Sequence, residues 1–312
     1  MGMFDLTHVV EAQQFDRDLL DIVFNTADDM KRALAGKNPY ARVLENKIMA
    51  SLFYEPSTRT RFSFESAMAR LGGRILTTEN AKEFSSAAKG ESLYDSTRIM
   101  NGYADIIVMR HHEAGSAKKA AEASGIPVIN AGDGAGQHPT QALLDLYTIK
   151  DNFQGIHGLQ IAMVGDLRYG RTVRSLSYLL AKYDDITIYF VSPAVCRMEE
   201  DIKAYLDKHE VNWHEEDSLE KVLPILDCVY MTRIQKERFI NPEDYKDAAG
   251  KYILTLEKVQ TMKEKAIIMH PLPRVNEIPQ AVDNDPRARY FEQAQNGLYI
   301  RMALLYLLLK DQ

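Results

Sequence analysis

The sequence is poor in cysteine, with only Cys196 and Cys228 among its 312 residues. Two cysteines so far apart in the chain are too few for a disulfide framework or a zinc knuckle, and we expect buried free thiols in their apolar surroundings. Long hydrophobic runs are also scarce. The most apolar run, from Leu298 to Leu309, is interrupted by Arg301. It is shorter than the roughly 20 residues that a membrane-spanning helix needs.

The sequence also lacks an excess of basic charge, because 38 Lys and Arg residues stand against 44 Asp and Glu residues, a formal charge of −6. A mildly acidic chain is not typical of a nucleic-acid-binding protein, although a local cluster of positive charge can still bind a small anion. The first residues show no basic and apolar regions of a secretion signal. We therefore expect a cytoplasmic protein with no nucleic-acid or membrane partner.

Repeats, low-complexity tracts and flexible linkers are absent too, and short apolar runs alternate with helical periods. The predicted strands are 48–53, 73–78, 104–110, 127–131, 159–164, 186–191, 211–214, 228–232 and 266–270. The predicted helices are 56–71, 92–101, 116–124, 139–150, 172–183, 199–209, 219–226 and 296–310. This alternation predicts an α/β fold with two domains, each a mostly parallel sheet flanked by helices. The helix that begins at Pro139 is the expected bridge between the domains.

Polar residues collect where the predicted strands end, which is where open α/β sheets bind ligands. These polar segments are Glu55–Arg61, Arg110–His112, Gly132–His138, Gly165–Asp166 with Arg171–Thr172, Arg233, and His270–Arg274.

The segment Pro56–Arg61 is the clearest candidate for an anion site. A turn with Ser57 and Thr58 opens a helix, whose free N–H groups and dipole favour a phosphate. Arg59 adds a planar fork of donors that matches phosphate oxygens. The alternative for a lone segment of this kind is an ordinary helix cap beside two solvated arginines. Five polar residues in line after a strand favour the anion site.

Residues 53–65, FYEPSTRTRFSFE, resemble the carbamoyl-phosphate motif of the aspartate and ornithine carbamoyltransferase superfamily. Further blocks match in order: 85–92 with Lys89-Gly90-Glu91, 108–111 (VMRH), 130–141 (NAGDGAGQHPTQ), 163–172 (MVGDLRYGRT), 231–238 (MTRIQKER) and 270–274 (HPLPR). The last two blocks resemble the aspartate branch, since the ornithine branch is expected to carry a cysteine-containing HCLP-type segment. The similarity covers nearly the whole chain.

The resemblance implies transfer of a carbamoyl group from carbamoyl phosphate to L-aspartate, an early step of pyrimidine biosynthesis. It implies a carbamoyl-phosphate domain of residues 1–138 and 292–312 and an aspartate domain of residues 139–291. It further implies a homotrimer whose active sites are shared between subunits. No cofactor or metal ion is expected, and a separate regulatory chain is a further candidate partner.

The resemblance also implies individual roles. Ser57, Thr58, Arg59 and Thr60 would bind the phosphate; Thr60, Arg110 and His138 would face the carbamoyl oxygen; and Gln141, with Pro271 and the carbonyl of Leu272, would contact the carbamoyl group. Arg171, Thr172, Arg233 and Gln235 would bind the carboxylates of aspartate. Ser85 and Lys89 would reach into a neighbouring subunit's site, where Lys89 also serves aspartate and the chemistry. Spacing to Lys89 favours Ser85 over Ser86.

Three other functions stay open. Gly165–Gly170 follows a strand and precedes a helix but lacks the G-x-G-x-x-G spacing of a nucleotide site. A carbamoyltransferase acting on ornithine fits less well, because arginines stand at the second-substrate positions. A binding protein without activity is disfavoured by the intact anion and oxyanion groups. His111 and His112 lack a third metal ligand at a suitable spacing, and no residue is a clear covalent nucleophile.

Two local expectations can be compared with the structure. Two prolines flank Leu272 directly after a buried-looking strand, and we expect the Leu272–Pro273 bond to be cis against the general preference for trans. Glu55 lies beside Pro56 in an arginine-rich surrounding. We expect its carboxylate to bridge to Arg171 or to the Arg233 region when both substrates are bound.

Overall fold

The computed structural model describes residues 4–234, 243, 245, 248 and 250–311. The chain folds into two compact units, the first made of Met1–Leu144 and Gln295–Gln312 and the second of Asp145–Ala294. Each unit contains one parallel sheet flanked by helices, which confirms the predicted fold class. Among the described residues, no helix combines the length and the apolarity needed to cross a membrane.

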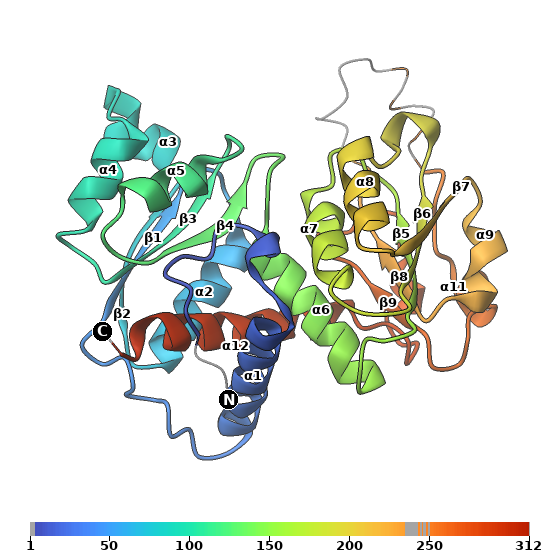
Figure 1. Ribbon diagram of the computed structural model, residues 1–312, viewed down its shortest axis with the longest axis horizontal. Coiled ribbons are helices and arrows are strands. Elements are labelled where there is room, and N and C mark those ends of the chain that lie inside the picture. The colour runs from blue at the N-terminus through green and yellow to red at the C-terminus, as the bar shows by residue number, and fades with distance from the viewer. Residues whose placement is uncertain (1–3, 235–242, 244, 246–247, 249, 312) are drawn as a thin grey trace. The chain divides into compact units, whose positions relative to one another are not determined.

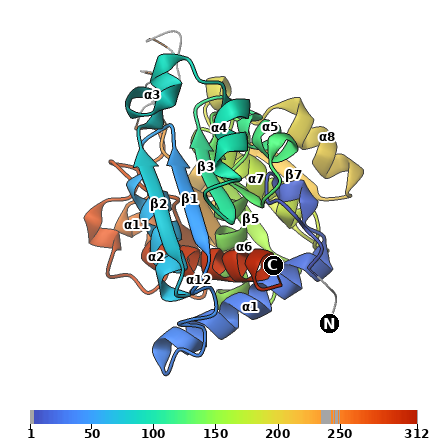
Figure 2. The same cartoon turned by 90° about the vertical axis from the view of Figure 1, so that its left-hand side faces the viewer.

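The sheet of the first unit has four parallel strands in the order β2-β1-β3-β4 (Figures 1 and 2). The strands are β1 (Ile48–Phe53), β2 (Arg74–Glu79), β3 (Ile106–His111) and β4 (Val128–Asp133). After β1 the chain moves to one edge of the sheet, and after β3 it moves to the other. The carboxyl ends of β1 and β3 therefore form a topological switch point, where such sheets bind ligands.

Helices cover both faces of this sheet. They are α1 (Arg17–Ala35), α2 (Thr58–Arg70), α3 (Ala81–Phe84), α4 (Leu93–Met100), α5 (Ser116–Ala123) and α12 (Tyr290–Leu309), with the start of α6 (Pro139–Phe153). Consecutive side chains of β1 point to opposite faces of the sheet, so they show which helix covers which face. Ala50 packs with Ala117 and Ala120 of α5 on one face. Ser51 donates a 3.2 Å hydrogen bond to Glu65 of α2 on the other face.

The sequence prediction missed α1 and began the final helix too late. The side chain of Asp16 caps α1 by accepting from the Leu19 N–H at 2.9 Å, and Gly36 follows its last residue. Buried residues repeat along one face of this helix, so both the cap and the periodicity were visible in the sequence. The final helix starts at Tyr290 rather than at residue 296.

The sheet of the second unit has five parallel strands in the order β7-β6-β5-β8-β9. They are β5 (Gln160–Val164), β6 (Thr187–Val191), β7 (Asn212–Glu216), β8 (Cys228–Met231) and β9 (Ile267–Met269). The chain moves outward in opposite directions after β5 and after β8. The second unit thus has its own switch point between the carboxyl ends of these two strands.

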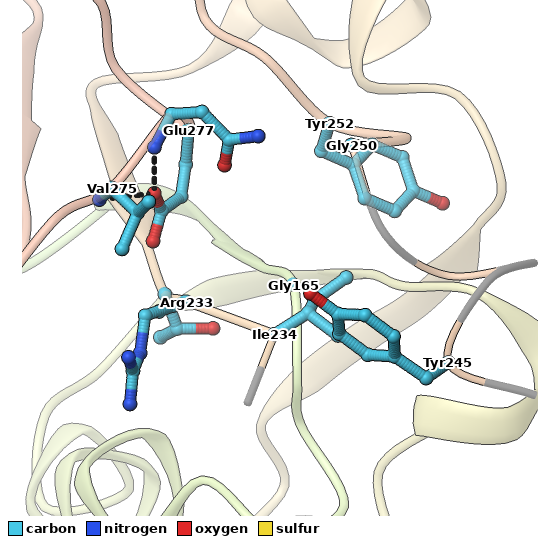
Figure 3. A pocket seen from close by; sticks show the side chains of 10 residues that line it. Gly165, Arg233, Ile234, Tyr245, Gly250, Tyr252, Val275 and Glu277 are labelled. Atoms are coloured by element: carbon cyan, nitrogen blue, oxygen red, sulfur yellow. Dashed lines mark hydrogen bonds between the residues drawn. The ribbon is translucent and has the colours of Figure 1, made fainter. Parts of the chain in front are cut away.

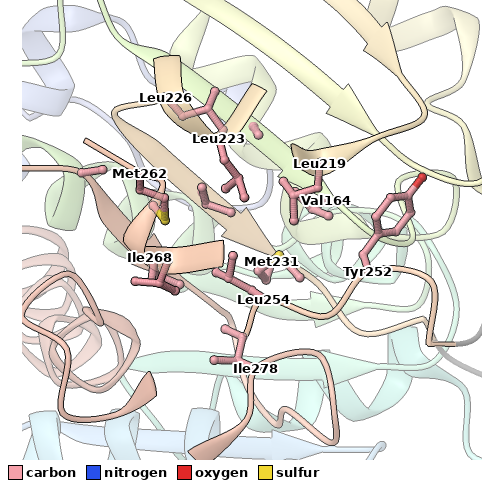
Figure 4. Packing of buried hydrophobic residues seen from close by; sticks show 14 of the residues in the cluster. Val164, Leu219, Leu223, Leu226, Met231, Tyr252, Leu254, Met262, Ile268 and Ile278 are labelled. Carbon is pink, nitrogen blue, oxygen red and sulfur yellow. The ribbon is translucent and has the colours of Figure 1, made fainter. Parts of the chain in front are cut away.

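One face of the second sheet carries the large apolar cluster drawn in Figure 4, in which Val164 and Met231 meet Leu219 and Leu223. The helices of this unit are the rest of α6, α7 (Arg171–Leu180), α8 (Glu200–Lys208), α9 (Leu219–Val222), α11 (Leu256–Gln260) and the first turn of α12. The predicted helix 219–226 is wrong in its length, because α9 gives way to a 3-10 turn at Leu223–Ile225, where Pro224 has no N–H to donate.

The backbone after β9 is held by a nearly buried pair, His270 and Glu277. The Nε2 atom of His270 lies 3.5 Å from Oε1 of Glu277. The other carboxylate oxygen of Glu277 accepts from the N–H groups of Val275 at 2.7 Å and Asn276 at 2.8 Å. Burial by itself raises the pKa of Glu277, but the hydrogen bonds from His270 and from the backbone outweigh it and lower this pKa to about 2.

The close approach of β5 and β8 gives a stability prediction at Gly165. This residue has φ +114°, and a Cβ atom there would lie 2.5 Å from the carbonyl oxygen of Thr232. We expect Gly165→Ala to lower the free energy of unfolding by about 1–3 kcal/mol, measured by urea denaturation. Gly155→Ala is the matched control, because a Cβ there meets nothing within 4 Å. Equal stability of the two variants would contradict the assigned contact.

The depressed pKa of Glu277 predicts a pH-dependent stability difference. A carboxylate with a lowered folded-state pKa stabilises the fold above its ordinary pKa and loses that contribution as the pH falls. Glu277→Gln should therefore be less stable than the parent by a constant amount above pH 4.5, and the difference should shrink as the pH falls towards about 2. Urea unfolding at several pH values measures it, with exposed Glu264→Gln as control. A difference that does not change with pH would count against an ionised, hydrogen-bonded Glu277.

Candidate functional site

The N-terminus of α2 follows β1 at the switch point of the first sheet. Ser57 is the N-cap residue of α2, with an extended φ of −159°, and its side chain makes no capping hydrogen bond. The first turn of the helix presents Thr58 and Arg59 to solvent, while Thr60 is 9% exposed. The first turn of α2 leaves backbone N–H groups without intrahelical partners in a segment that also carries three hydroxyl side chains, as a phosphate site requires.

The two arginines of this segment have different surroundings. Arg61 turns to the neighbouring strand, where its Nη2 donates to Glu79 at 2.8 Å and its Nη1 lies 3.5 Å from Glu65. Arg61 therefore braces α2 against β2. Arg59 makes no ion pair or hydrogen bond with another residue in the described part of the chain. Its guanidinium is the one that a ligand can use.

Arg110 lies at the end of β3, directly beside β1. Its Nε donates to a carboxylate oxygen of Glu55 at 2.9 Å, and its Nη1 lies 3.4 Å from the carbonyl oxygen of Ala131. Glu55 thus has a partner in its own unit. The expected bridge from Glu55 to Arg171 or the Arg233 region joins different units and stays a prediction.

His111 has a structural role in this edge of the sheet. Its Nδ1 accepts from the Glu113 N–H at 3.1 Å and lies 2.9 Å from the hydroxyl of Ser116. Burial first, and then the neighbouring His112, lower the pKa of His111. No group of three or more His, Cys, Asp or Glu side chains within the described residues is placed to hold a metal ion.

The loop from β4 to α6 is shaped by a buried aspartate. Asp133 is 4% exposed; its Oδ1 accepts from the Gln137 N–H at 2.6 Å and its Oδ2 from the Gly115 N–H at 2.7 Å. The loop ends at His138, which is 4% exposed and whose carbonyl accepts from the Gln141 N–H at 3.0 Å. His138 and Gln141 are therefore fixed at the first turn of α6.

Ser85 and Lys89 lie in a short exposed segment. Ser85 connects α3 to the 3-10 turn Ser86–Lys89, and its hydroxyl donates to the Ala81 carbonyl and accepts from the Ala87 N–H. The side chain of Lys89 is exposed and contacts no acceptor among the described residues. Among the described residues, no hydrogen bond or ion pair joins Ser85 or Lys89 to the start of α2.

A second buried aspartate shapes the loop from β5 to α7. The N–H of Asp166 donates to the hydroxyl of Thr232 at 3.1 Å, and the Asp166 carboxylate accepts from the Tyr169 N–H at 3.0 Å. The loop leads to Arg171 and Thr172, the first two residues of α7. Arg171 is 8% exposed, so its guanidinium is largely enclosed by protein.

Arg233 follows β8 and lines a cavity of about 250 Å³ within the second unit. Figure 3 shows Arg233 and Glu277 on its wall, with Tyr245 and Tyr252 across from them. The lining of the cavity thus includes one arginine, while the Glu277 carboxylate on the same wall is already engaged by the Val275 and Asn276 N–H groups. Gln235, the remaining predicted aspartate contact, lies outside the described residues.

The segment His270–Arg274 has the expected turn. The Leu272–Pro273 bond is cis, as predicted, and Leu272 has a φ of +54°. The Leu272 N–H donates to Nδ1 of His270 at 2.8 Å. Arg274 is engaged elsewhere, because its Nη2 donates to Asp283 at 2.7 Å and its guanidinium stacks over the Tyr290 ring.

The structure places Ser57–Thr60 and Arg110 at the first switch point, and Arg171, Thr172 and Arg233 at the second. The other predicted residues lie apart from these two points or outside the described residues: His138 and Gln141 follow β4, Pro271 and Leu272 follow β9, Ser85 and Lys89 lie in their own segment, and Gln235 is not described. The sequence prediction missed the buried carboxylates that hold these loops: Asp133, Asp166 and Glu277. The first two stand directly beside glycine at the end of a strand, which is a visible signal for a loop-shaping side chain. Glu277 has no comparable signal, since its partner His270 is recognised only in the folded chain.

Comparison with known proteins agrees with this arrangement. Residues 7–151 match the description "Aspartate/ornithine carbamoyltransferase, carbamoyl-P binding domain", and residues 157–308 match "Aspartate/ornithine carbamoyltransferase, Asp/Orn binding domain". The chain is 58% identical over 307 residues to aspartate carbamoyltransferase 2, chloroplastic, of Pisum sativum, covering 98% of this chain and 80% of that protein.

Solved structures give the same result. The catalytic subunit of aspartate transcarbamoylase from Methanocaldococcus jannaschii superposes with a TM-score of 0.91 at 46% identity, covering 98% of this chain and 99% of that one. The Trypanosoma cruzi enzyme in complex with carbamoyl phosphate and aspartate superposes with a TM-score of 0.91 at 38% identity, covering 97% of each chain. Matches of this extent in both units show that the chain belongs to the aspartate/ornithine carbamoyltransferase family.

Proposed function

We propose that the chain transfers the carbamoyl group of carbamoyl phosphate to L-aspartate, giving N-carbamoyl-L-aspartate and phosphate in an early step of pyrimidine biosynthesis. The observation that carries this proposal is that one chain contains two complementary sets of candidate binding residues. An anion-binding helix start lies at the first switch point, and arginines lie at the second. The relatives named aspartate carbamoyltransferase, at 47–58% identity over nearly the full chain, support the same activity.

In this proposal the first unit holds carbamoyl phosphate. Ser57, Thr58, Arg59 and Thr60 bind the phosphate through N–H groups, hydroxyls and the guanidinium. Arg110 and His138, with Thr60, face the carbamoyl oxygen. Gln141 contacts the carbamoyl amide. This assignment rests on the solvent-facing Arg59 and on the loops that fix Arg110 and His138 at neighbouring strand ends.

The second unit binds aspartate in this proposal. Arg171, Thr172, Arg233 and Gln235 hold the two carboxylates of the substrate. Pro271 and the carbonyl of Leu272 contact the carbamoyl group from the segment that follows β9. The cavity beside Arg233 and the enclosed guanidinium of Arg171 support this division of labour.

The chemistry follows from the substrates and the donors. The aspartate amine attacks the carbamoyl carbon, the bond from that carbon to the phosphate oxygen breaks, and the leaving phosphate takes the amine proton. Negative charge develops on the carbamoyl oxygen in the tetrahedral transition state, where fixed donors such as Arg110 and His138 stabilise it most. Proximity supplies much of the remaining acceleration, and no cofactor is needed.

The proposed assembly is a homotrimer in which Ser85 and Lys89 complete a neighbour's site. Leu76 on the edge strand β2 and Phe62 on the adjacent α2 are 48% and 54% exposed, which supports a protein interface beside that segment. A separate regulatory chain is a further proposed partner. We place the protein in the cytoplasm, and the two cysteines, both free and buried as expected, are consistent with a reducing compartment.

The activity is tested by incubating the purified chain with carbamoyl phosphate and L-aspartate and measuring carbamoyl aspartate. L-ornithine in place of aspartate is the matched control, because it has the same amino-acid backbone without the second carboxylate. Carbamoylation of aspartate but not of ornithine, each in the presence of carbamoyl phosphate, supports the proposal. Carbamoylation of ornithine but not of aspartate, or of neither amino acid, rejects it.

The two arginines Arg59 and Arg233 should affect different substrates. Loss of a charge-assisted contact costs on the order of 2–5 kcal/mol. We expect Arg59→Ala to weaken carbamoyl phosphate use and the chemical step, and Arg233→Ala to weaken chiefly aspartate use. Steady-state kinetics with each substrate varied in turn measure this. Arg197→Ala, an exposed arginine paired with Glu215, is the control. Equal effects of both variants on both substrates would refute the assignment.

Shared sites predict complementation between subunits. Lys89→Ala and Arg110→Ala chains should each be inactive alone, because every site carries one defect. Mixing the two after dissociation should restore part of the activity, since some hybrid sites combine an intact Lys89 with an intact Arg110. Size measurements confirm that both variants assemble. Assembled hybrids without activity would show that the site lies within one subunit.

A further inference from the structure

Four buried side chains link separate elements of the second unit. They are Tyr230 on β8, Asp145 on α6, Gln293 in the first turn of α12, and His270 directly after β9. None of the four is more than 1% exposed. Buried polar groups cost free energy unless they are hydrogen-bonded, so a chain of four requires a specific set of partners.

Asp145 lies at the centre of this group. Its Oδ2 accepts from the Tyr230 hydroxyl at 2.7 Å, and its Oδ1 accepts from Nε2 of Gln293 at 2.6 Å. Hydrogen bonds to a buried carboxylate are stronger and shorter than those between neutral groups. Asp145 therefore fixes which end of the Gln293 amide faces it.

The other end of that amide reaches the backbone. With Nε2 turned to Asp145, Oε1 of Gln293 accepts from the His270 N–H at 2.8 Å. The next residue, Pro271, has no N–H, and the N–H of Leu272 donates to the His270 ring. Every N–H from His270 to Leu272 is thus held inside the protein. Gln293 therefore fixes the peptide group that joins Met269 to His270, at the start of the segment that leads to the Leu272 carbonyl.

The opposite end of the group reaches α7. Thr172, the second residue of that helix, is a polar neighbour of the Tyr230 hydroxyl and by itself lowers the pKa of Tyr230. Burial first, and then the neighbouring Asp145, raise the pKa of Tyr230 well above its ordinary value, so the hydroxyl keeps the proton that it donates. One set of hydrogen bonds therefore links Tyr230, Asp145 and Gln293 to the backbone N–H of His270.

We propose that Tyr230, Asp145 and Gln293 are positioning residues that hold the His270–Leu272 backbone in the geometry needed for carbamoyl transfer. This inference rests on the proposed function, in which the Leu272 carbonyl contacts the carbamoyl group. None of the three touches the substrates. They act by fixing a peptide group, and a shift of that group by a fraction of an ångström lowers the rate more than it lowers stability.

The first test compares Gln293→Met with Gln295→Met, an exposed glutamine two residues further along. We expect kcat of Gln293→Met to fall about tenfold or more while KM for aspartate changes less than about twofold, because the lost contact orients the reacting group rather than the aspartate carboxylates. Gln295→Met should keep the parent kcat. Parent-like turnover in a folded Gln293→Met chain would overturn the proposal.

A double-mutant cycle tests whether the residues act together. Tyr230→Phe removes one hydroxyl and keeps the ring. If Gln293→Met fails to fold, the kcat of Tyr230→Phe can be measured in its place. Its control is Tyr189→Phe on β6. If both positions act through Asp145, the kcat loss of the double variant should be clearly smaller than the product of the single losses. If the kcat loss of the double variant equals the product of the two single losses, the two positions act independently, and the proposal is overturned.

Hydrogen exchange gives a readout that does not need activity. In the stretch 270–273 only His270 and Leu272 have exchangeable backbone N–H groups, since Pro271 and Pro273 have none. We expect these two to exchange at least about tenfold faster in Gln293→Met than in the parent, while the peptide of β6 is unchanged. Parent-like exchange would overturn the proposal. If the parent makes no carbamoyl aspartate, the proposed function fails, and this measurement alone decides the positioning role.

Discussion

The parallel arrangement of strands is the constraint on which the site depends. Parallel strands bring all carboxyl ends of a sheet to one edge, and the reversal of strand order opens that edge between two neighbours. In the first unit the neighbours are β1 and β3, and in the second they are β5 and β8. Both openings receive the start of a helix and an arginine at the end of the adjacent strand. The same topology thus occurs in both units, at the kind of edge where open α/β sheets bind ligands.

Buried acidic side chains then set the shape of each loop at these edges. Asp133 and Asp166 accept backbone N–H groups in the loops before α6 and α7. Glu277 does the same after β9, and Asp145 acts through Gln293 on the same segment. Of the groups assigned to substrates, His138 and Arg171 directly follow loops that Asp133 and Asp166 shape. A buried carboxylate that accepts several hydrogen bonds is rigid, so it can hold a loop in one conformation.

The sequence predicted those features of the fold and site that are local in the chain. The alternation of strands and helices predicted the fold class, which the structure confirms, and the polar run after β1 predicted an anion site at the start of α2. The sequence assigned the phosphate to Arg59, but the structural role of Arg61 is recognised only from its contacts with Glu65 and Glu79 in the folded chain. The helix α1 was missed although its cap and periodicity were visible.

The positioning network was beyond sequence reasoning for a physical reason. Asp145, Tyr230 and Gln293 are separated by more than sixty residues at each step, and none belongs to a short motif. In sequence, a tyrosine in a strand and a glutamine in a helix are unremarkable. Their role follows from the burial that removes water as an alternative partner, which is a property of the folded second unit.

The most direct test of the central claim is a crystal structure with phosphonoacetamide, in which a methylene group replaces the bridging oxygen of carbamoyl phosphate. The account predicts the phosphonate against the N–H groups and hydroxyls of Ser57–Thr60, with Arg59 on its oxygens. The amide oxygen should lie within hydrogen-bonding distance of Arg110 and His138. A phosphonate bound instead at the Gly165–Thr172 loop, with the start of α2 empty, would contradict it.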